Sequence, residues 1–450
     1  MPEPLMMIRT VFYANVLLVL CATIAQAETY IVETSTQLMD AAAALEPGDT
    51  LFLKDATYTI PTYAVTVRAD HVVIAGLSGG RERVIVSGAG MNNDIDHGFW
   101  VDANNVTIRD LTIKNVRYHC IQTNVNIDSL RVINCILRDG GEQLLKVPYS
   151  ASEPSPSEAG LVEGCLFDFS AGIAARGYTG GIDCHFAKNW IVRNNVFRNI
   201  RSPEDSPAEH AVHFWTNSEN TLVENNVIID CDRGIGFGLG DVAHIGGTIR
   251  NNMIYHRAIG GSDRADVGIG LETCTNTAVY NNTVYFENDY PNAIEYRFSA
   301  TSGVVIANNL TNKAIRARDN ASGTLSTNVT AAQAGWFRSP SSGDLHLSSG
   351  SIAAVIDQGT TIDGLTWDID GDARPQGSRI DIGADEYTDA GILMPLTVRQ
   401  FRSAGMSGTR FIVMTGKRGG LGRTESHNLA GRRIRNNGSM CGVYFIISRP

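Results

Sequence analysis

The phrase IVRNNVF at residues 191–197 returns as LVENNVI at residues 222–228, 31 residues further along the chain. Related phrases, in which Asn-Asn or a variant of it lies between apolar residues, occur at residues 106–111, 130–136, 161–166, 249–254, 279–284 and 305–310. Successive phrases are separated by 24 to 31 residues. This spacing is typical of a solenoid whose coils carry loops of different length.

Within each unit, apolar and largely β-branched residues alternate with polar ones, which is the period of a β-strand and not of a helix. A repeat made only of short strands cannot bury its apolar face alone, so successive coils must stack about 4.8 Å apart as parallel strands. Equivalent residues then lie above one another. We expect the paired asparagines to form side-chain ladders at the bend between two strands: Asn194/Asn195, Asn225/Asn226, Asn251/Asn252 and Asn281/Asn282. The sequence therefore predicts an all-β, parallel β-helix.

In these repeats the chain resembles the secreted bacterial right-handed parallel β-helix proteins of the pectate-lyase-like superfamily. The resemblance covers residues 30–387. It implies a right-handed solenoid with a carbohydrate-binding groove on its outer face, and calcium is a cofactor of several lyases with this fold. Because one scaffold can host many unrelated activities, the resemblance assigns no particular reaction.

The N-terminus has the features of a secretory signal peptide at residues 1–27. Arg9 precedes an apolar run at residues 11–22, and AQA at residues 25–27 is a typical cleavage site. The apolar run is too short to span a bilayer. We therefore predict a secreted (extracellular or periplasmic) protein that begins at Glu28, has no membrane span and is a monomer.

The predicted β-helix domain occupies residues 28–388 and has a cap at each end. A helix at residues 35–45, capped by Ser35, presents four apolar side chains that can cover the first coil: Leu38, Ala41, Ala42 and Leu45. Four short segments between residues 343 and 386 resemble the closing segment of many bacterial β-helix proteins, so we expect a C-terminal cap there.

One segment of that cap begins like a calcium-binding loop. Asp368, Asp370 and Asp372 have the right spacing, but the twelfth position is Arg379, where such a loop needs a bidentate Glu. A polar, salt-bridged turn is therefore the favoured interpretation. Calcium stays an alternative without a complete ligand motif, and no other cofactor is assigned.

Residues 389–450 differ in composition from the rest. From residue 391 onward there are ten Lys and Arg but one acid, Glu425, which leaves 27 basic and 46 acidic residues in the preceding part. The net charge is thus +9 for the tail and −19 for the main body. The repeat also stops, so we predict a basic, poorly ordered tail. The acidic main body argues against nucleic acid as a partner.

Eight cysteines are present, and Cys135 and Cys165 occupy the repeat position of Asn195 and Asn226. Stacking on adjacent coils about 4.8 Å apart places them within reach of a disulfide. A ladder of small buried thiols that replaces the Asn ladder is the alternative. The other cysteines lack the C-x-x-C spacing of zinc sites, so no metal cluster is predicted.

The strand that follows each Asn bend has a middle residue that should point outward. These residues form a predicted column: Trp100, Gln122, Lys146, Asp183, His213, Gly236, Gly270 and Glu295. Two positions further on, the same face adds Asp102, Asn124, His185, Trp215, Glu272 and Arg297. Long inserts at residues 148–160, 170–180, 201–209 and 257–266 flank the central strands, and long loops on a regular scaffold are usually functional. A groove at this place is expected to hold a linear polysaccharide.

Three residues are predicted to be catalytic: Lys146, Asp183 and His213. Lys146 suits the base or the charge-neutralising group of a lyase, and His213 can be an acid or base near neutral pH. The alternatives are a solvated Lys146 and a His213 that is hydrogen-bonded to the loop before it. Asp183 together with Glu272 or Glu295 would suit a glycoside hydrolase, if their carboxyl groups lie about 5 to 10 Å apart.

Six further residues are predicted to bind substrate: His185, His210, Trp215, Glu272, Glu295 and Arg297. Trp215 and Trp100 offer ring faces on which sugars can stack. The favoured function is a secreted lyase of uronate-containing polysaccharides, with a hydrolase second. The alternative of another class is a non-catalytic carbohydrate-binding or cell-surface β-helix protein.

Overall fold

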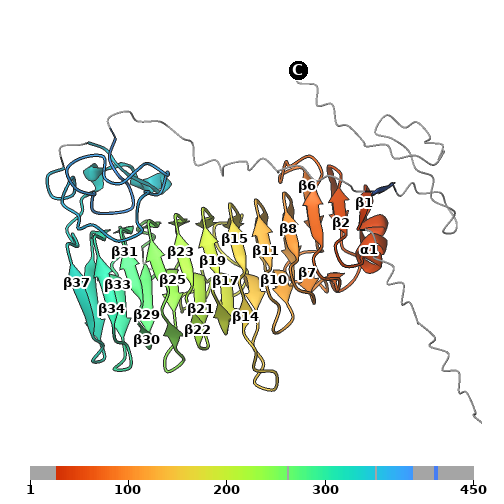
Figure 1. Cartoon of the computed structure of the whole chain (residues 1–450), viewed down its shortest axis with the longest axis horizontal. Coiled ribbons are helices and arrows are strands. Elements are labelled where there is room, and N and C mark those ends of the chain that lie inside the picture. Colours follow the sequence, from red (N-terminus) through yellow and green to blue (C-terminus); the bar gives the residue numbers. More distant parts are fainter. Residues whose placement is uncertain (1–26, 261–262, 350–351, 389–409, 414–450) are drawn as a thin grey trace, which may run out of the picture.

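The computed structural model describes residues 27–260, 263–349, 352–388 and 410–413. The chain winds into a parallel β-helix, in which the coils follow one another along the long axis (Figure 1). This confirms the predicted all-β solenoid. Within the described residues no helix is long and apolar enough to cross a membrane, and the predicted signal sequence lies outside them, apart from Ala27.

Sheet A has 13 strands and runs along the whole solenoid. Its strands in spatial order are β37 (Gly323–Ser326), β34 (Val304–Ala307), β31 (Ala278–Tyr280), β27 (Thr248–Arg250), β23 (Leu222–Glu224), β19 (Ile191–Arg193), β15 (Leu161–Glu163), β11 (Arg131–Ile133), β8 (Thr107–Arg109), β5 (Val73–Gly76), β2 (Thr50–Leu53), β1 (Glu28–Val32) and β40 (Arg410–Val413). β40 lies in the segment predicted as the tail and pairs in parallel with β1. The rest of that segment, from residue 389 on, is outside the described residues.

Sheets B and C have 10 strands each, and sheet D has 5. Sheet B contains β3 (Ala56–Thr59), β6 (Val84–Ser87), β9 (Thr112–Val116), β12 (Ile136–Gly140), β16 (Leu166–Asp168), β20 (Val196–Arg198), β24 (Val227–Ile229), β28 (Met253–His256), β32 (Thr283–Phe286) and β35 (Leu310–Thr311). Sheet C contains β4 (Val65–Val67), β7 (His97–Val101), β10 (His119–Thr123), β13 (Gln143–Val147), β17 (Gly180–His185), β21 (His210–Trp215), β25 (Arg233–Phe237), β29 (Ile269–Glu272), β33 (Asn292–Arg297) and β36 (Ala314–Arg318). Sheet D contains β14 (Ser157–Glu158), β18 (Ala187–Lys188), β22 (Ser218–Glu219), β26 (His244–Ile245) and β30 (Cys274–Thr275).

The predicted asparagine ladder is present at the bend between sheets A and B. Asn195, Asn226 and Asn252 are buried, and each donates its amide N–H to the Oδ1 of the next asparagine, at 3.0, 2.9 and 2.9 Å. The same Oδ1 atoms accept the backbone N–H of the preceding ladder residue. The first asparagine of each pair makes the bend, because Asn194 and Asn225 adopt positive φ angles of 57° and 55°. The two asparagines therefore have separate roles.

Cys135 and Cys165 continue this ladder as free thiols, which was one of the two alternatives. The backbone N–H of Cys135 donates to Cys165 Sγ at 3.3 Å, and that of Cys165 donates to Asn195 Oδ1 at 2.8 Å. Burial raises the pKa of the Cys135 thiol well above its usual value. The Cys135 thiol thus remains protonated in the core.

We expect Asn252→Ala to lower the free energy of unfolding by about 1–3 kcal/mol. The change leaves the buried N–H of Asn226 and the carbonyl oxygen of Val223 without their partners, and unsatisfied buried groups cost about that much each. Chemical denaturation would measure the loss. Asn92→Ala, at an exposed asparagine without a positive φ, is the matched control, and an equal loss there would contradict the role of the ladder.

The predicted N-terminal helix is α1 (Ser35–Ala44), but its N-cap is Thr34 and not Ser35. Thr34 Oγ1 accepts the N–H of Gln37, and Gln37 Oε1 accepts the N–H of Thr34 at 3.2 Å, so the two residues form a reciprocal capping box. Four apolar side chains of the helix and its C-cap are buried in the main core, as predicted: Leu38, Ala41, Ala42 and Leu45.

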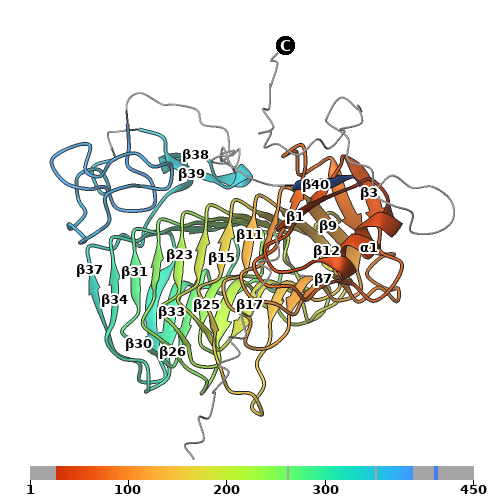
Figure 2. The same ribbon diagram turned by 45° about the vertical axis from the view of Figure 1, so that its right-hand side comes forward.

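The C-terminal segment lies alongside the solenoid and does not close its end (Figures 1 and 2). It contains η1 (Ala334–Trp336), β38 (Phe337–Ser339), η2 (Pro340–Ser342) and β39 (Asp344–Leu347). Leu345 and Ile382 from this segment form a second core together with Val227 and Met253 of sheet B. The residues that follow Val227 and Met253 in their strands belong to the main core, so these two side chains lie on the outer face of the sheet. The apolar outer face of sheet B therefore attracts the segment, while β37 of the last coil stays exposed.

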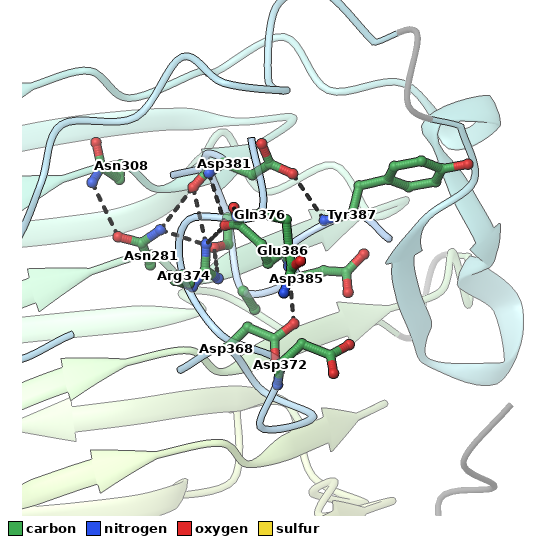
Figure 3. A network of polar contacts seen from close by, with 12 residues as sticks. Asn281, Asn308, Asp368, Asp372, Arg374, Gln376, Asp381, Asp385, Glu386 and Tyr387 are labelled. Atoms are coloured by element: carbon green, nitrogen blue, oxygen red, sulfur yellow. Dashed lines mark hydrogen bonds and ion pairs between the residues drawn. The ribbon is translucent and has the colours of Figure 1, made fainter. Parts of the chain in front are cut away.

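A buried polar network holds this segment in place (Figure 3). Arg374 pairs with Glu386 at 2.8 Å, and the two side chains are 0% and 1% exposed. Arg374 also donates to the carbonyl oxygen of Gly383 at 2.8 Å. Asn281 of the repeat donates its amide to the carbonyl oxygen of Asp381 at 2.9 Å, which connects the network to the solenoid.

The aspartates that begin like a calcium loop form a polar turn. Asp368 is fully buried, and its Oδ1 accepts the N–H groups of Asp370 and Asp372 at 2.9 and 2.7 Å. Its Oδ2 accepts the N–H of Glu386 at 3.0 Å. The Asp368 oxygens are thus occupied by the backbone, in agreement with the turn and against the calcium alternative for this residue.

His346 gives the segment a pH-dependent contact. Its ring nitrogens lie 2.5 Å from Asp344 Oδ1 and 2.9 Å from Asp370 Oδ2. Burial alone would lower its pKa, but these two carboxylates raise the pKa of His346 from 6.5 to about 10. The charged imidazole therefore stabilises the fold fully below about pH 6.5, and this contribution is lost as the pH rises through about 10.

We expect His346→Gln to lower the melting temperature by about 2–5 °C at pH 6.5, and by much less near pH 10, where the wild type has lost the charge. Buried Asp385 lies near, and burial raises its pKa to about 6. Asp385 is present in both proteins, so comparison at equal pH removes most of its effect. Thermal melts across this pH range test the prediction, and a difference that grows with pH would contradict it.

Candidate functional site

The predicted outward column exists in the register of sheet C. Lys146 pairs with Asp183, Asp183 with His213 and His213 with Gly236 across β13, β17, β21 and β25. His185 pairs with Trp215 two residues further along. The three residues predicted to be catalytic are thus on successive coils, as the repeat indicated.

The centre of the column is covered, although the sequence suggested solvent-facing positions. The side chains of Asp183 and His213 are 3% and 1% exposed, and that of Lys146 is 13% exposed. Glu209, at the end of the loop at residues 201–209, contributes to this cover, because its Oε2 lies 3.5 Å from His213 Nδ1. Asp232 Oδ2 accepts the N–H groups of Ser202 and Ala208 at 2.8 and 2.9 Å, which anchors both ends of the loop. The site therefore lies outside the solenoid core but beneath its loops.

Asp183 is the centre of the contacts. Lys146 Nζ donates to Asp183 Oδ2 and lies 2.9 Å from His185 Nε2. The indole N–H of Trp215 donates to Asp183 Oδ1 at 2.8 Å. The Trp215 ring also stacks on His213, with centroids 5.5 Å apart and an angle of 5° between the planes. Trp215 thus holds Asp183, and its role as a stacking surface for sugars stays a prediction.

Lys146 and Asp183 form an ion pair. Burial alone would raise the pKa of Asp183, but the hydrogen bond with His185 and the charge of Lys146 hold that pKa far below its usual value. For Lys146, burial lowers the pKa, and the Asp183 carboxylate more than reverses this, so that the net shift is upward. Lys146 is therefore a cation. Of its two predicted roles, this favours neutralising the charge of a substrate carboxylate over acting as the base.

The pKa values of the two neighbouring histidines shift in opposite directions. Burial would lower the pKa of His213, but Glu209 and then Asp183 raise it overall. Glu209 Oε2 lies 3.5 Å from His213 Nδ1, and Asp183 Oδ1 lies 4.0 Å from it. Burial and then the charge of His213 lower the pKa of His210 well below its usual value. Its imidazole packs 4.5 Å from that of His213.

Several residues near the column were missed at the sequence level. His97 and His119 precede the apolar residues of β7 and β10, and their rings stack 5.4 Å apart at an angle of 13°. Burial lowers their pKa values to about 4 and about 3. Tyr178, from one of the predicted loops, is 54% exposed, and its pKa is raised by burial although Lys146 lowers it. The pairing His97↔His119 across neighbouring repeats is the signal that could have identified the histidines.

The remaining predicted residues lie away from the Lys146–Asp183 pair. Glu272 is on β29, three strands from β17 in the order of sheet C, and Glu295 on β33 is four strands away. Three strand spacings amount to about 14 Å, which exceeds the carboxyl separations of glycosidases. The expected separation of about 5 to 10 Å between Asp183 and these carboxylates is therefore wrong, because the His213 and Gly236 coils lie between Asp183 and Glu272, and the Gly270 coil also precedes Glu295.

These distant residues also have local partners. Arg297 Nη1 lies 3.5 Å from Glu272 Oε1, and Arg297 Nε lies 2.9 Å from Asp319 Oδ2. Glu295 accepts hydrogen bonds from Tyr290 at 2.6 Å and from Arg318 at 2.7 Å. Glu272, Glu295 and Arg297 therefore contact residues of the C-terminal coils.

No protein-family model and no curated protein sequence matches the chain. Solved structures share its fold. The crystal structure of pectate lyase Pel9A aligns over 81% of this chain and 97% of its own, with a TM-score of 0.51 and 14% identity. An alginate lyase from Paenibacillus sp. str. FPU-7 aligns over 67% and 98%, with a TM-score of 0.48 and 15% identity. Dettilon tailspike protein aligns over 61% and 57%, with a TM-score of 0.39 and 15% identity. The predicted resemblance to pectate-lyase-like β-helix proteins is confirmed at the level of the fold.

Proposed function

We propose that the chain is a polysaccharide lyase that cleaves a uronate-containing polymer over the Lys146 region of sheet C. The observation that carries the proposal is the Lys146–Asp183 ion pair with His185 against it, outside the solenoid core and beneath loops. Ion pairs that are largely removed from water rarely improve stability over apolar side chains, whereas groups with strongly shifted pKa values cluster at functional sites.

An acidic polymer fits the charge of the accessible group. The main body is acidic as a whole, but Lys146 keeps 13% of its side chain exposed, and its charge can attract a uronate carboxylate. Pectate and alginate are the first polymers to test, because lyases of both are among the structures with a similar fold.

The lyase reaction removes the proton from the carbon next to the uronate carboxylate, breaks the glycosidic C–O bond, forms a C=C bond and returns a proton to the leaving oxygen. In the proposed arrangement Lys146 neutralises the carboxylate and stabilises the charge that develops on it. As Lys146 moves toward the substrate, His185 Nε2 is released from its contact with Nζ and accepts the proton. The Tyr178 phenol, whose pKa is raised, supplies the proton for the leaving oxygen.

Asp183 and His213 then act as positioning residues. Asp183 orients Lys146, and Trp215 holds Asp183 from the next coil. The side chain of His213 is 1% exposed, and its Nε2 donates to the carbonyl oxygen of Gly238 at 3.1 Å. His213 is therefore placed to contact Asp183 and not to contact a polymer.

A non-catalytic carbohydrate-binding protein is the second candidate, because aromatic rings gather on the first coils of the same face. Tyr63 is 46% exposed and lies 5.8 Å from Trp100 between ring centroids. Exposed rings of this kind can stack on sugars without any chemistry. Export through residues 1–27 is part of both proposals, since polymers of this type lie outside the cytoplasm.

The purified protein should be incubated with pectate, alginate and other uronate polymers, and ultraviolet absorbance would detect the unsaturated product. The lyase proposal expects absorbance that rises with time and disappears in Lys146→Met. Arg316→Ala, which changes an exposed cation on the last strand of sheet C, is the matched control and should keep full activity. Retention on a polymer column without any unsaturated product would favour the binding protein instead.

A further inference from the structure

Glu209, His210 and His213 bring three potential metal-ligand atoms together at one end of the Asp183 cluster. One ligand atom from each side chain lies within 4.8 Å of those of the other two. Two imidazoles and one carboxylate make up a donor set that is common in transition-metal sites of proteins. These three residues were not predicted from the sequence to bind a metal, because they belong to no C-x-x-C pair and no aspartate loop.

The orientation of His213 is that of a metal-binding imidazole. Its Nε2 lies 3.1 Å from the carbonyl oxygen of Gly238, which can only accept, so Nε2 carries the proton. Nδ1 then faces the carboxylate of Glu209 at 3.5 Å and that of Asp183 at 4.0 Å. A cation at Nδ1, either a proton or a metal ion in its place, offsets the charge of these two carboxylates. Ligating histidines usually donate their other ring N–H to a backbone carbonyl in this way.

His210 supplies an independent observation. His210 is 7% exposed, and its Nδ1 is buried without a hydrogen-bond partner in the described structure. The Oε2 atom of Glu209 likewise has no hydrogen-bond donor there. Buried polar groups left without partners cost about 1–3 kcal/mol each, and such groups in native proteins require an explanation.

The scaffold also makes room for these side chains. A Cβ added at Gly236 would lie 2.6 Å from His210 Nε2, so a side chain there would displace the imidazole. Glu209 is held by its backbone N–H, which donates to the carbonyl oxygen of Thr179 at 2.7 Å. The neighbouring cation, Arg233, is paired with Asp266 at 3.0 Å and does not neutralise Glu209 by contact.

We propose that Glu209, His210 and His213 bind one divalent transition-metal ion, for which Zn²⁺ is the probe. Two imidazole ligands disfavour Ca²⁺, which prefers oxygen ligands. The ligand atoms of tetrahedral zinc lie about 3.3 Å apart at bond lengths of about 2.0–2.1 Å, so binding must draw the three side chains slightly together. Three protein ligands leave a coordination position open, and Asp183 Oδ1 lies 4.0 Å from His213 Nδ1.

The full chain, treated with a chelator and dialysed, should be titrated with ZnCl₂ in a calorimeter, and bound metal should be counted by elemental analysis. We expect one zinc per chain and a melting temperature that rises with zinc but not with CaCl₂. Co²⁺ in place of zinc should give a visible absorption band. His210→Gln and Glu209→Gln should each weaken zinc binding at least tenfold and change the cobalt band.

The second group with this composition, His346, Asp370 and Asp385, supplies the control. His346→Gln should leave the zinc count and the cobalt band unchanged. The proposal is overturned if the full chain binds no zinc, if binding follows His346 instead, or if both Glu209→Gln and His210→Gln keep wild-type affinity. Because these measurements use no polysaccharide, their outcome is separate from that of the lyase proposal.

Discussion

Lys146→Met is expected to lower turnover on the cleaved polymer by a hundredfold or more. The substitution keeps the length and apolar stem of the side chain but removes the charge that neutralises the uronate carboxylate, and a lost electrostatic partner of the transition state costs about that much. Initial rates at saturating polymer would measure the effect. Arg316→Ala should retain the wild-type rate, and equal losses in both variants would contradict the assignment of Lys146.

The same substitution also affects stability, because Asp183 would remain nearly buried without its cation. The double variant Lys146→Met with Asp183→Asn removes both charges and should recover most of the lost melting temperature, but not the activity. Rates must therefore be measured well below the melting temperature of each variant. Full activity of Lys146→Met on a polymer that the wild type cleaves would contradict the proposed site.

Arg374→Met is expected to lower the free energy of unfolding by about 3–5 kcal/mol. The change leaves the Glu386 carboxylate, whose side chain is 1% exposed, without its cation, and removing one partner of a buried pair typically costs this amount. It also removes the donors to the carbonyl oxygens of Asp381 and Gly383. Chemical denaturation followed by circular dichroism would measure the change.

Two variants make this result specific. Arg374→Met with Glu386→Gln removes both charges and should be more stable than Arg374→Met alone. Arg338→Met changes an exposed arginine in β38 of the same segment and should alter stability by less than about 0.5 kcal/mol. If Arg374→Met proved no worse than Arg338→Met, the ion pair in Figure 3 would not anchor the segment.

Most of the solenoid could be predicted because its information is local and repeated. The alternation of apolar residues defines strands, and the recurrence of Asn-Asn defines which residues stack. The register from Lys146 through Asp183 to His213 follows from that count alone. The N-cap was missed by one residue, because Thr34 and Ser35 both have capping side chains and the bond between Thr34 and Gln37 decides between them.

The candidate site was only partly predictable. A strand period tells which side chains point away from the core, but not whether a loop covers them. Asp183 contacts Lys146 and Trp215, and His213 contacts Glu209 from an irregular loop, which has no repeat from which its path can be read. The association of Glu209 with His213 depends on that path.

By itself, the sequence determined the all-β solenoid, the stacking of equivalent residues and the outward column on sheet C, since each of these depends on periodic contacts between neighbouring coils. Tertiary structure alone decided the rest. It brought Glu209 to His213 and laid the C-terminal segment against sheet B. These outcomes depend on side-chain contacts between parts of the chain that do not follow the repeat. Such contacts, with the burial and charge effects that they bring, form only once the coils have stacked.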